Sequence, residues 1–225
     1  MDISRTMTIS PDTADRSKLT DRDRLVIEIA KQTAIGLRRS AASHSITRVR
    51  DFVDGLTFAG MLVQKNTPGT ETPPFAEIVA TMTPVFRRVV ETRQIKDAEA
   101  SLADMKGRLG VVTQSPSQMI VNLGLTAEGI IADIAREYTL SKQECLQVLA
   151  FAIVFAIMAT SPPEDLDADL DALIVETSEK IAHWDGFIPS DEEMFGDMDW
   201  GDEDDEDDED GGADDDETEA DDTPH

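Results

Sequence analysis

The order of apolar and polar residues predicts an all-α protein. Between residues 20 and 186, apolar side chains recur three and four positions apart, a spacing that gathers them on one face of a helix. The first such stripe follows Thr20 and Asp23, which have the spacing of a capping box. Its members are Val26, Ile29, Ala30, Thr33 and Leu37. The whole pattern predicts a helical bundle of about six or seven helices.

Turn and start signals divide the rest of this region into helices. The run rich in glycine, proline and threonine at residues 66–74 is typical of a loop. Pro84 interrupts the broad apolar face that follows, so that helix is expected to kink or to divide in two. A shorter amphipathic helix is expected over residues 97–109. Ser115, with a proline directly after it, is expected to cap the next helix.

One segment is apolar without interruption. Ser141 and Glu144 form a second capping pair, and the helix that they start contains VLAFAIVFAIMA from Val148 to Ala159. Twelve residues that rise about 1.5 Å each cannot cross about 30 Å of hydrocarbon. We therefore expect a buried central helix of the bundle, ended by Pro162, and no membrane span.

Residues 164–184 resemble a calcium-binding loop at several ligand positions. These positions hold Asp165, Asp167, Asp169, Asp171 and Glu176. Such a loop needs glycine at its sixth position, where this chain has Leu170. Apolar residues repeat at helical spacing through the same segment. The sequence therefore predicts an amphipathic helix here and no metal site.

Charge divides the chain into two unlike parts. The 225 residues carry 47 acidic and 20 basic side chains, which gives a formal net charge of -27. Residues 1–162 hold 18 acids and 19 bases, whereas residues 163–225 hold 29 acids and one base, Lys180. A chain so acidic is not expected to approach nucleic acid or an anionic membrane as a whole.

The last 39 residues form an acidic tail, defined here as residues 187–225. It contains 21 acids and neither lysine nor arginine. Its few large apolar side chains cannot offset the entropy of ordering the backbone, and its carboxylates repel one another. The sequence therefore predicts three parts, namely a flexible N-terminus at residues 1–19, a helical domain at 20–186 and a disordered tail at 187–225.

Residues 133–149 resemble a helix-turn-helix unit, with Thr139 where the turn glycine usually stands. The second helix of this unit runs directly into the apolar segment, so most of it is expected to be buried. An ordinary hairpin of two helices uses the same residues and is the interpretation that we favour. The basic and polar residues that could contact DNA, or the acidic tail, are Arg38, Arg39, Arg48, Arg50, Lys142 and Gln143.

Catalytic chemistry finds little support. The three histidines are not spaced as metal ligands relative to one another or to the single cysteine, Cys145. Cys145 falls in the first turn of a helix, where a thiol can become reactive, but a small core-lining residue is the favoured interpretation. We expect no enzyme activity, no cofactor and no metal. One cysteine and a first segment without an apolar core predict a cytoplasmic protein.

The acidic tail carries apolar side chains before its densest run of acids. The expected partner-binding residues are Met194, Phe195, Met198, Trp200, Asp202, Glu203, Asp204 and Asp205. The simplest interpretation is that the tail only keeps the protein soluble. The sharper hypothesis is that its apolar residues enter pockets of a basic protein while the carboxylates cover lysines and arginines, as a nucleic acid would.

The sequence thus predicts a non-enzymatic interaction protein whose tail engages a basic partner, in an assembly, chaperone-like or nucleic-acid-mimic role. The alternative is a DNA-binding regulator whose helix-turn-helix-like unit is masked by the tail. Nucleic acid is not expected to bind unless the tail is displaced. No membrane partner is expected, and self-association of the helical domain stays open.

Overall fold

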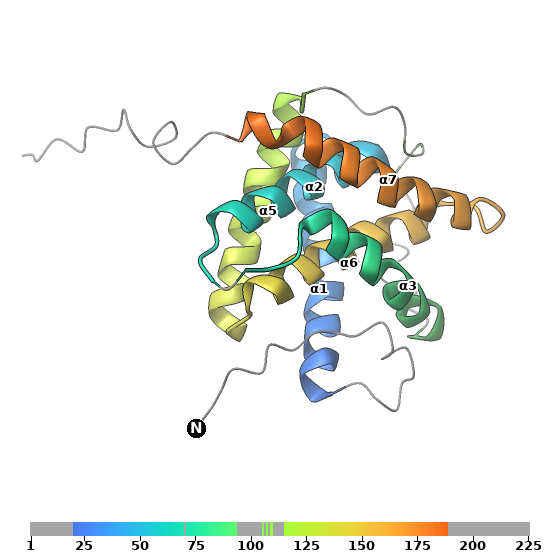
Figure 1. The fold of residues 1–225 in the computed structure, drawn as a ribbon. Helices are drawn as coiled ribbons and strands as arrows, with labels where there is room; N and C mark the ends of the chain where they lie inside the picture. Colours follow the sequence, from blue (N-terminus) through green and yellow to red (C-terminus); the bar gives the residue numbers. More distant parts are fainter. Residues whose placement is uncertain are drawn as a thin grey trace, which may run out of the picture. The chain divides into compact units, whose positions relative to one another are not determined.

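The computed structural model describes residues 20–69, 71–93, 105, 107, 109 and 115–188. Its regular elements within these ranges are all helical, and six of them are α-helices (Figure 1). They are α1 (Asp21–Ser43), α2 (Val49–Asn66), α3 (Phe75–Arg93), α5 (Gln118–Tyr138), α6 (Lys142–Thr160) and α7 (Leu166–Trp184), followed by a short 3-10 turn, η3 (Asp185–Phe187). The prediction of an all-α bundle is confirmed.

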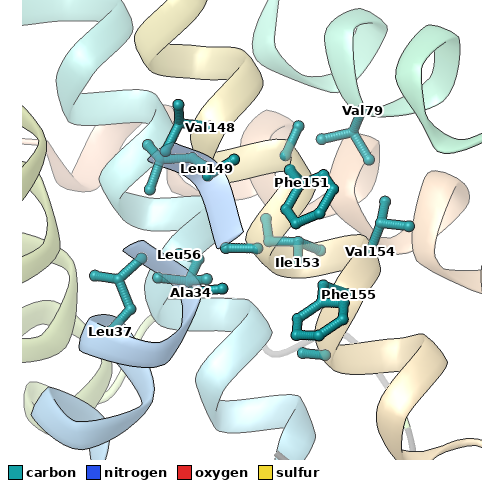
Figure 2. Packing of buried hydrophobic residues seen from close by; sticks show 14 of the residues in the cluster. Ala34, Leu37, Leu56, Val79, Val148, Leu149, Phe151, Ile153, Val154 and Phe155 are labelled. Carbon is teal, nitrogen blue, oxygen red and sulfur yellow. The ribbon is translucent and has the colours of Figure 1, made fainter. Parts of the chain in front are cut away.

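Helix α6 is the buried centre that its composition predicts. Every residue from Gln143 to Ile157 is buried, and α1, α2 and α3 all pack against the helix. Figure 2 shows Leu37 of α1 and Leu56 of α2 on one side of α6, and Val79 of α3 on another. The ring of Phe151 meets that of Phe86 edge to face, with centroids 5.0 Å apart.

Both predicted capping boxes are present. The Thr20 hydroxyl accepts from the Asp23 amide at 3.1 Å, and the Asp23 carboxylate accepts from the Thr20 amide at 2.9 Å. Ser141 and Glu144 exchange the same pair of bonds at the start of α6. Each box satisfies amide groups that a helix leaves without partners in its first turn, so local sequence alone fixes where α1 and α6 begin.

One helix boundary differs from the sequence-based expectation, and one of the two outcomes expected at Pro84 is excluded. Ser117, not Ser115, caps α5, because its hydroxyl is the one that accepts from the Ile120 amide, at 3.4 Å. Pro84 lies inside α3 and does not divide it. Its ring is exposed, so the carbonyl left without an amide partner lies toward the solvent side. Of the helix expected over residues 97–109, all but three residues lie outside the described ranges.

The end of the helical domain packs in a second, smaller apolar cluster. Trp184 and Ile188 are buried there against Phe58, whose ring lies 6.4 Å from that of Trp184. The Ile188 carbonyl accepts from Lys65 Nζ at 3.1 Å. Ile188 was expected in the tail, but the 3-10 turn directs it back onto α2. The packed part of the chain therefore includes at least Ile188, which lies beyond the predicted boundary at residue 186.

Candidate partner-binding groove

A groove of about 360 Å³ lies between α1 and α5. Its apolar lining is Leu25, Ile29 and Gly36 of α1 with Ile130, Ile134 and Tyr138 of α5. We call this hollow the α1–α5 groove. It exists because α5 packs closely against α2 but makes few contacts with α1, which packs mainly on α6.

Helix α5 supplies the groove with apolar surface that the bundle does not cover. In a stretch of 18 consecutive, mainly apolar residues of each helix, 28% of the residues are buried in α5 and 83% in α6. Both helices are long and apolar enough to cross a membrane, a test that core helices of soluble proteins also pass. For α6 the burial explains its composition. For α5 the exposed side chains, Leu125 and Tyr138 among them, still need an explanation.

Gly36 deepens part of the groove because it has no side chain to fill the lining. A Cβ atom built on Gly36 would have no other atom within 4 Å, so the missing side chain leaves open space in the lining. Gly129 of α5 is equally open but does not line the groove. This pair differs from Gly124, where a Cβ atom would lie 2.6 Å from the Phe58 ring because α5 and α2 pack closely there.

The charged groups that line the groove are two carboxylates. Glu28 lies on α1, where Lys31 donates to it at 2.8 Å, and Glu137 lies on α5. Hydrogen bonding to the Glu137 carboxylate, together with its negative charge, raises the pKa of the Tyr138 phenol above its ordinary value. Gln32 and Thr33 complete the polar part of the lining. The groove is therefore apolar inside, and of its two carboxylates one is paired with Lys31 and the other is hydrogen-bonded to Tyr138.

Arg22 joins α1 to the turn between α5 and α6. Its guanidinium donates to Glu144 at 2.7 and 3.0 Å and to the carbonyls of Tyr138 and Thr139 at 3.2 and 2.9 Å. Burial raises the pKa of Glu144, but the bonds from Arg22 and Ser141 outweigh burial and hold it below its ordinary value. Tyr138, at this end of the groove, is thus held by its backbone as well as by packing.

The helix-turn-helix-like unit is a hairpin of two helices within the bundle. Thr139 adopts the left-handed conformation (φ 51°) that glycine usually supplies in such turns. Gln143 and Gln147 are buried in α6, which corrects the expectation that Gln143 could contact DNA. Lys142 is half-buried. The second helix therefore leaves little surface that could enter a major groove.

The expected basic contact residues lie at two separate places. Arg38 and Arg39 lie one turn before the end of α1, and Arg48 and Arg50 flank the start of α2. Lys142 instead lies 3.6 Å from the position of a Cβ atom on Gly69, beyond the other end of α2. An α-helix of 18 residues is about 27 Å long, so the four arginines and Lys142 do not form one surface.

Among these arginines, exposure also differs. Arg39 and Arg48 are exposed, whereas Arg38 is buried and Arg50 is half-buried with its Nε 3.8 Å from Asp54. Two of the four arginines are therefore not presented to a partner as the sequence suggested. The tail residues expected to bind a partner, Met194 to Asp205, lie outside the described residues.

A buried cluster of charges joins α7 to α2. The ammonium group of Lys180 pairs with the Asp54 carboxylate, and both side chains are almost fully removed from solvent. Lys180 also donates to Glu176 at 3.2 Å. Burial raises the pKa of Asp54 and of Glu176, and the charge of Lys180 opposes that rise. Sequence reasoning missed this cluster, although a lysine on the face of Leu173 and Thr177 is a signal of it.

Cys145 lies in the core, as favoured from the sequence. Burial, and then the charge of Glu144, raises the pKa of its thiol to about 11. A small hollow of about 260 Å³ reaches it between α2 and α5. Among the described residues, histidine, cysteine and acidic side chains form no group of three or more that could hold a metal ion.

No protein-family model matches this chain, and no curated protein or solved structure is significantly similar to it. The α1–α5 groove could not be predicted from the sequence, because helical spacing shows which face of a helix is apolar but not which neighbouring helix covers that face. The available signal was the width of the apolar face of α5, which exceeds what one neighbouring helix covers.

Proposed function

We propose that this protein binds a basic protein partner and performs no catalysis of its own. One observation carries the proposal: residues 189–225 hold 21 acids without a lysine or arginine, directly after a helical domain whose described packing includes Ile188. The other 188 residues hold 26 acids and 20 bases. Because the negative charge is so concentrated in residues 189–225, we infer that these acids do more than keep the protein soluble.

The domain gives residues 189–225 a firm point of attachment. Trp184 and Ile188 pack in the second apolar cluster, and Lys65 binds the Ile188 carbonyl. The segment from which the tail continues is therefore anchored on α7 and α2. Binding of a partner to the tail would bring the helical domain to that partner.

The chemistry of the tail points to lysine- and arginine-rich surfaces. Carboxylates in series attract them as a phosphate backbone does, with an affinity that falls steeply with salt. Phe195 and Trp200, which precede the densest acids, add apolar contacts that a simple polyanion lacks. A protein of this design competes with nucleic acid for a basic partner, or covers that partner during assembly.

The alternative, a DNA-binding regulator masked by its tail, gains no support from the geometry. Its recognition helix is α6, the buried centre of the bundle. Its basic residues lie at opposite ends of α2. We therefore do not propose a DNA-binding role.

The proposal is tested by comparing two full-length baits in a pull-down from the lysate of the source cells. One bait has the natural sequence, and the other has asparagine or glutamine in place of each acid at residues 202–210. A basic protein retained by the natural bait alone is then purified, and its Kd for each bait is measured at about 50 and about 300 mM salt.

We expect the neutralised bait to bind that protein at least about tenfold more weakly at low salt, and the difference to shrink at high salt. A matched variant with alanine at Phe195 and Trp200 measures the apolar contribution. Equal retention by both baits at low salt overturns the proposal. In that case the acids would serve solubility only.

A further inference from the structure

The α1–α5 groove has the form that an amphipathic helix requires. On α1 its apolar residues Leu25, Ile29 and Gly36 are four and then seven positions apart, and on α5 Ile130, Ile134 and Tyr138 are each four positions apart. Residues so spaced form a row along each helix, and two rows bound a trough that a third helix can enter. Grooves of this kind are a recurrent mode of peptide recognition.

Charge decides which helix fits. The charged residues that line the groove are Glu28 and Glu137, and Lys31 already pairs with Glu28. The charge preference therefore rests mainly on Glu137, which would pair with a lysine or arginine beside the apolar stripe of an incoming helix and would repel an acid there. The tail of this chain, with 21 acids and no basic residue, is therefore a poor occupant. A second copy is disfavoured too, because two chains of net charge -27 repel each other.

We infer that the α1–α5 groove docks a basic amphipathic helix of the partner whose remaining cationic surface is covered by residues 189–225. This inference rests on the proposed function and adds to it the kind of segment that the domain recognises. The groove selects an apolar stripe, and the tail selects positive charge. The two contacts share one partner, so each raises the local concentration for the other.

The test uses designed peptides as probes, each about 18 residues long, or about five helical turns. The first peptide carries leucines at three and four spacing with lysines elsewhere, the second has the same composition in scrambled order, and the third replaces lysine by glutamate in the striped order. Their Kd values for the full-length chain are measured by fluorescence anisotropy. The tail alone cannot distinguish the first two peptides, because their charge and composition are equal.

Two glycine variants isolate the groove. Gly36→Leu places a side chain in the open space of the groove lining, whereas Gly129→Leu adds the same group to α5 outside the lining. Neither new Cβ atom meets another atom within 4 Å, so both variants are expected to fold. We expect the natural chain to favour the striped over the scrambled lysine peptide by at least about tenfold. Gly36→Leu should abolish that preference, and Gly129→Leu should keep it.

The outcomes separate this inference from the proposed function. If neutralising residues 202–210 weakens the binding of both lysine peptides but leaves the ratio of their Kd values unchanged, both the groove inference and the proposed function stand. If the ratio is unaffected by Gly36→Leu, or the glutamate peptide binds as well as the striped lysine peptide, the groove inference fails while the tail proposal survives. If neutralising residues 202–210 weakens the binding of neither lysine peptide, only the proposed function fails.

Other occupants of the groove would give their own results, each of which overturns the inference. Tighter peptide binding after deletion of residues 2–19 would show that the N-terminal segment occupies the groove. A dimer in sedimentation that Gly36→Leu dissociates would identify a second copy. Sedimentation of the natural chain, but not of Gly36→Leu, with vesicles of phosphatidylcholine would identify a bilayer.

Discussion

Arg22 and Glu144 lie 122 positions apart in the chain, yet their side chains hold the first turns of α1 and α6 together through two hydrogen bonds of 2.7 and 3.0 Å. The same carboxylate completes the capping box of α6 by accepting from the Ser141 amide at 2.7 Å. One side chain thus serves both the start of the central helix and the position of α1. The relationship makes Arg22 a test of how the bundle is held together.

Arg22→Ala should lower the free energy of unfolding by about 2–3 kcal/mol at pH 7, because the largely buried Glu144 carboxylate loses its cation. The pKa of Glu144 is below its ordinary value of 4.5 in the folded chain. Its contribution is therefore present above pH 4.5 and is lost as the pH falls through the folded pKa. Urea unfolding at pH 7 and in acid measures both effects.

The control for this variant is Arg136→Ala, which removes an exposed pair with Asp133 on α5. That change should alter the free energy of unfolding by no more than about 0.5 kcal/mol. A similar loss in the free energy of unfolding for both variants would show that the contacts of Arg22 stabilise the protein no more than an exposed ion pair does.

Lys180→Met should lower the free energy of unfolding by about 3–5 kcal/mol at pH 7, because Asp54 would stay buried without its closest cation. Burial already raises the pKa of Asp54 above 3.8, and loss of Lys180 raises it further. A carboxyl with a raised folded pKa stabilises the fold below its unfolded pKa, and this contribution is lost as the pH rises through the folded value. The deficit should therefore shrink as the pH is lowered from 7 toward 4.

The half-buried Lys142 offers the matched control, since Lys142→Met removes a lysine from α6 and leaves the pair of Lys180 with the buried Asp54 intact. Its effect should stay within about 0.5 kcal/mol at either pH. If the loss from Lys180→Met were the same at both pH values, Lys180 would act through packing rather than charge.

Gly124→Ala should destabilise the protein by about 1–3 kcal/mol, because the new methyl group would lie 2.6 Å from the Phe58 ring and 3.2 Å from the Gly55 carbonyl. Gly129→Ala, one turn later in the same helix, should stabilise it by about 0.5–1 kcal/mol, since the site is open and alanine favours helix. Thermal unfolding of the two variants compares them directly. A loss of stability in both would mean that α5 tolerates no added side chain, contrary to its described packing.

The thiol of Cys145 should be nearly inert in the folded protein. Its pKa of about 11 and its burial leave little thiolate at pH 8. We expect a colorimetric disulfide reagent to modify the native chain at least about 100-fold more slowly than the urea-unfolded chain. Cys145→Ala serves as the blank because the chain has one cysteine. Equal rates would restore the interpretation of a thiol activated by its helix terminus.

The parts of the fold that could be predicted from sequence depend on neighbours in the chain. Capping pairs such as Ser141 with Glu144 lie within one turn, and the apolar run after Val148 is buried whichever helices surround it. The helix over residues 166–184 could likewise be separated from a calcium loop by one position, Leu170. Each of these signals acts over a few residues.

What could not be predicted depends on which helix covers which face. The Asp54–Lys180 pair joins residues 126 positions apart, and no local pattern specifies that match. The α1–α5 groove arises from the spacing of two helices that both pack better against other neighbours. Ile188 joins the core only because a short turn directs it toward α2. Tertiary packing settles each of these points.

The burial of Lys180 has a practical consequence for anyone mapping a complex of this protein. It is the last lysine of the chain, and its amine faces Asp54 rather than solvent. Acetylation, ubiquitin transfer and amine-directed cross-linkers therefore find no accessible lysine target after Lys142 while α7 stays docked. Cross-linking maps of the C-terminal region will need chemistry aimed at carboxyl groups.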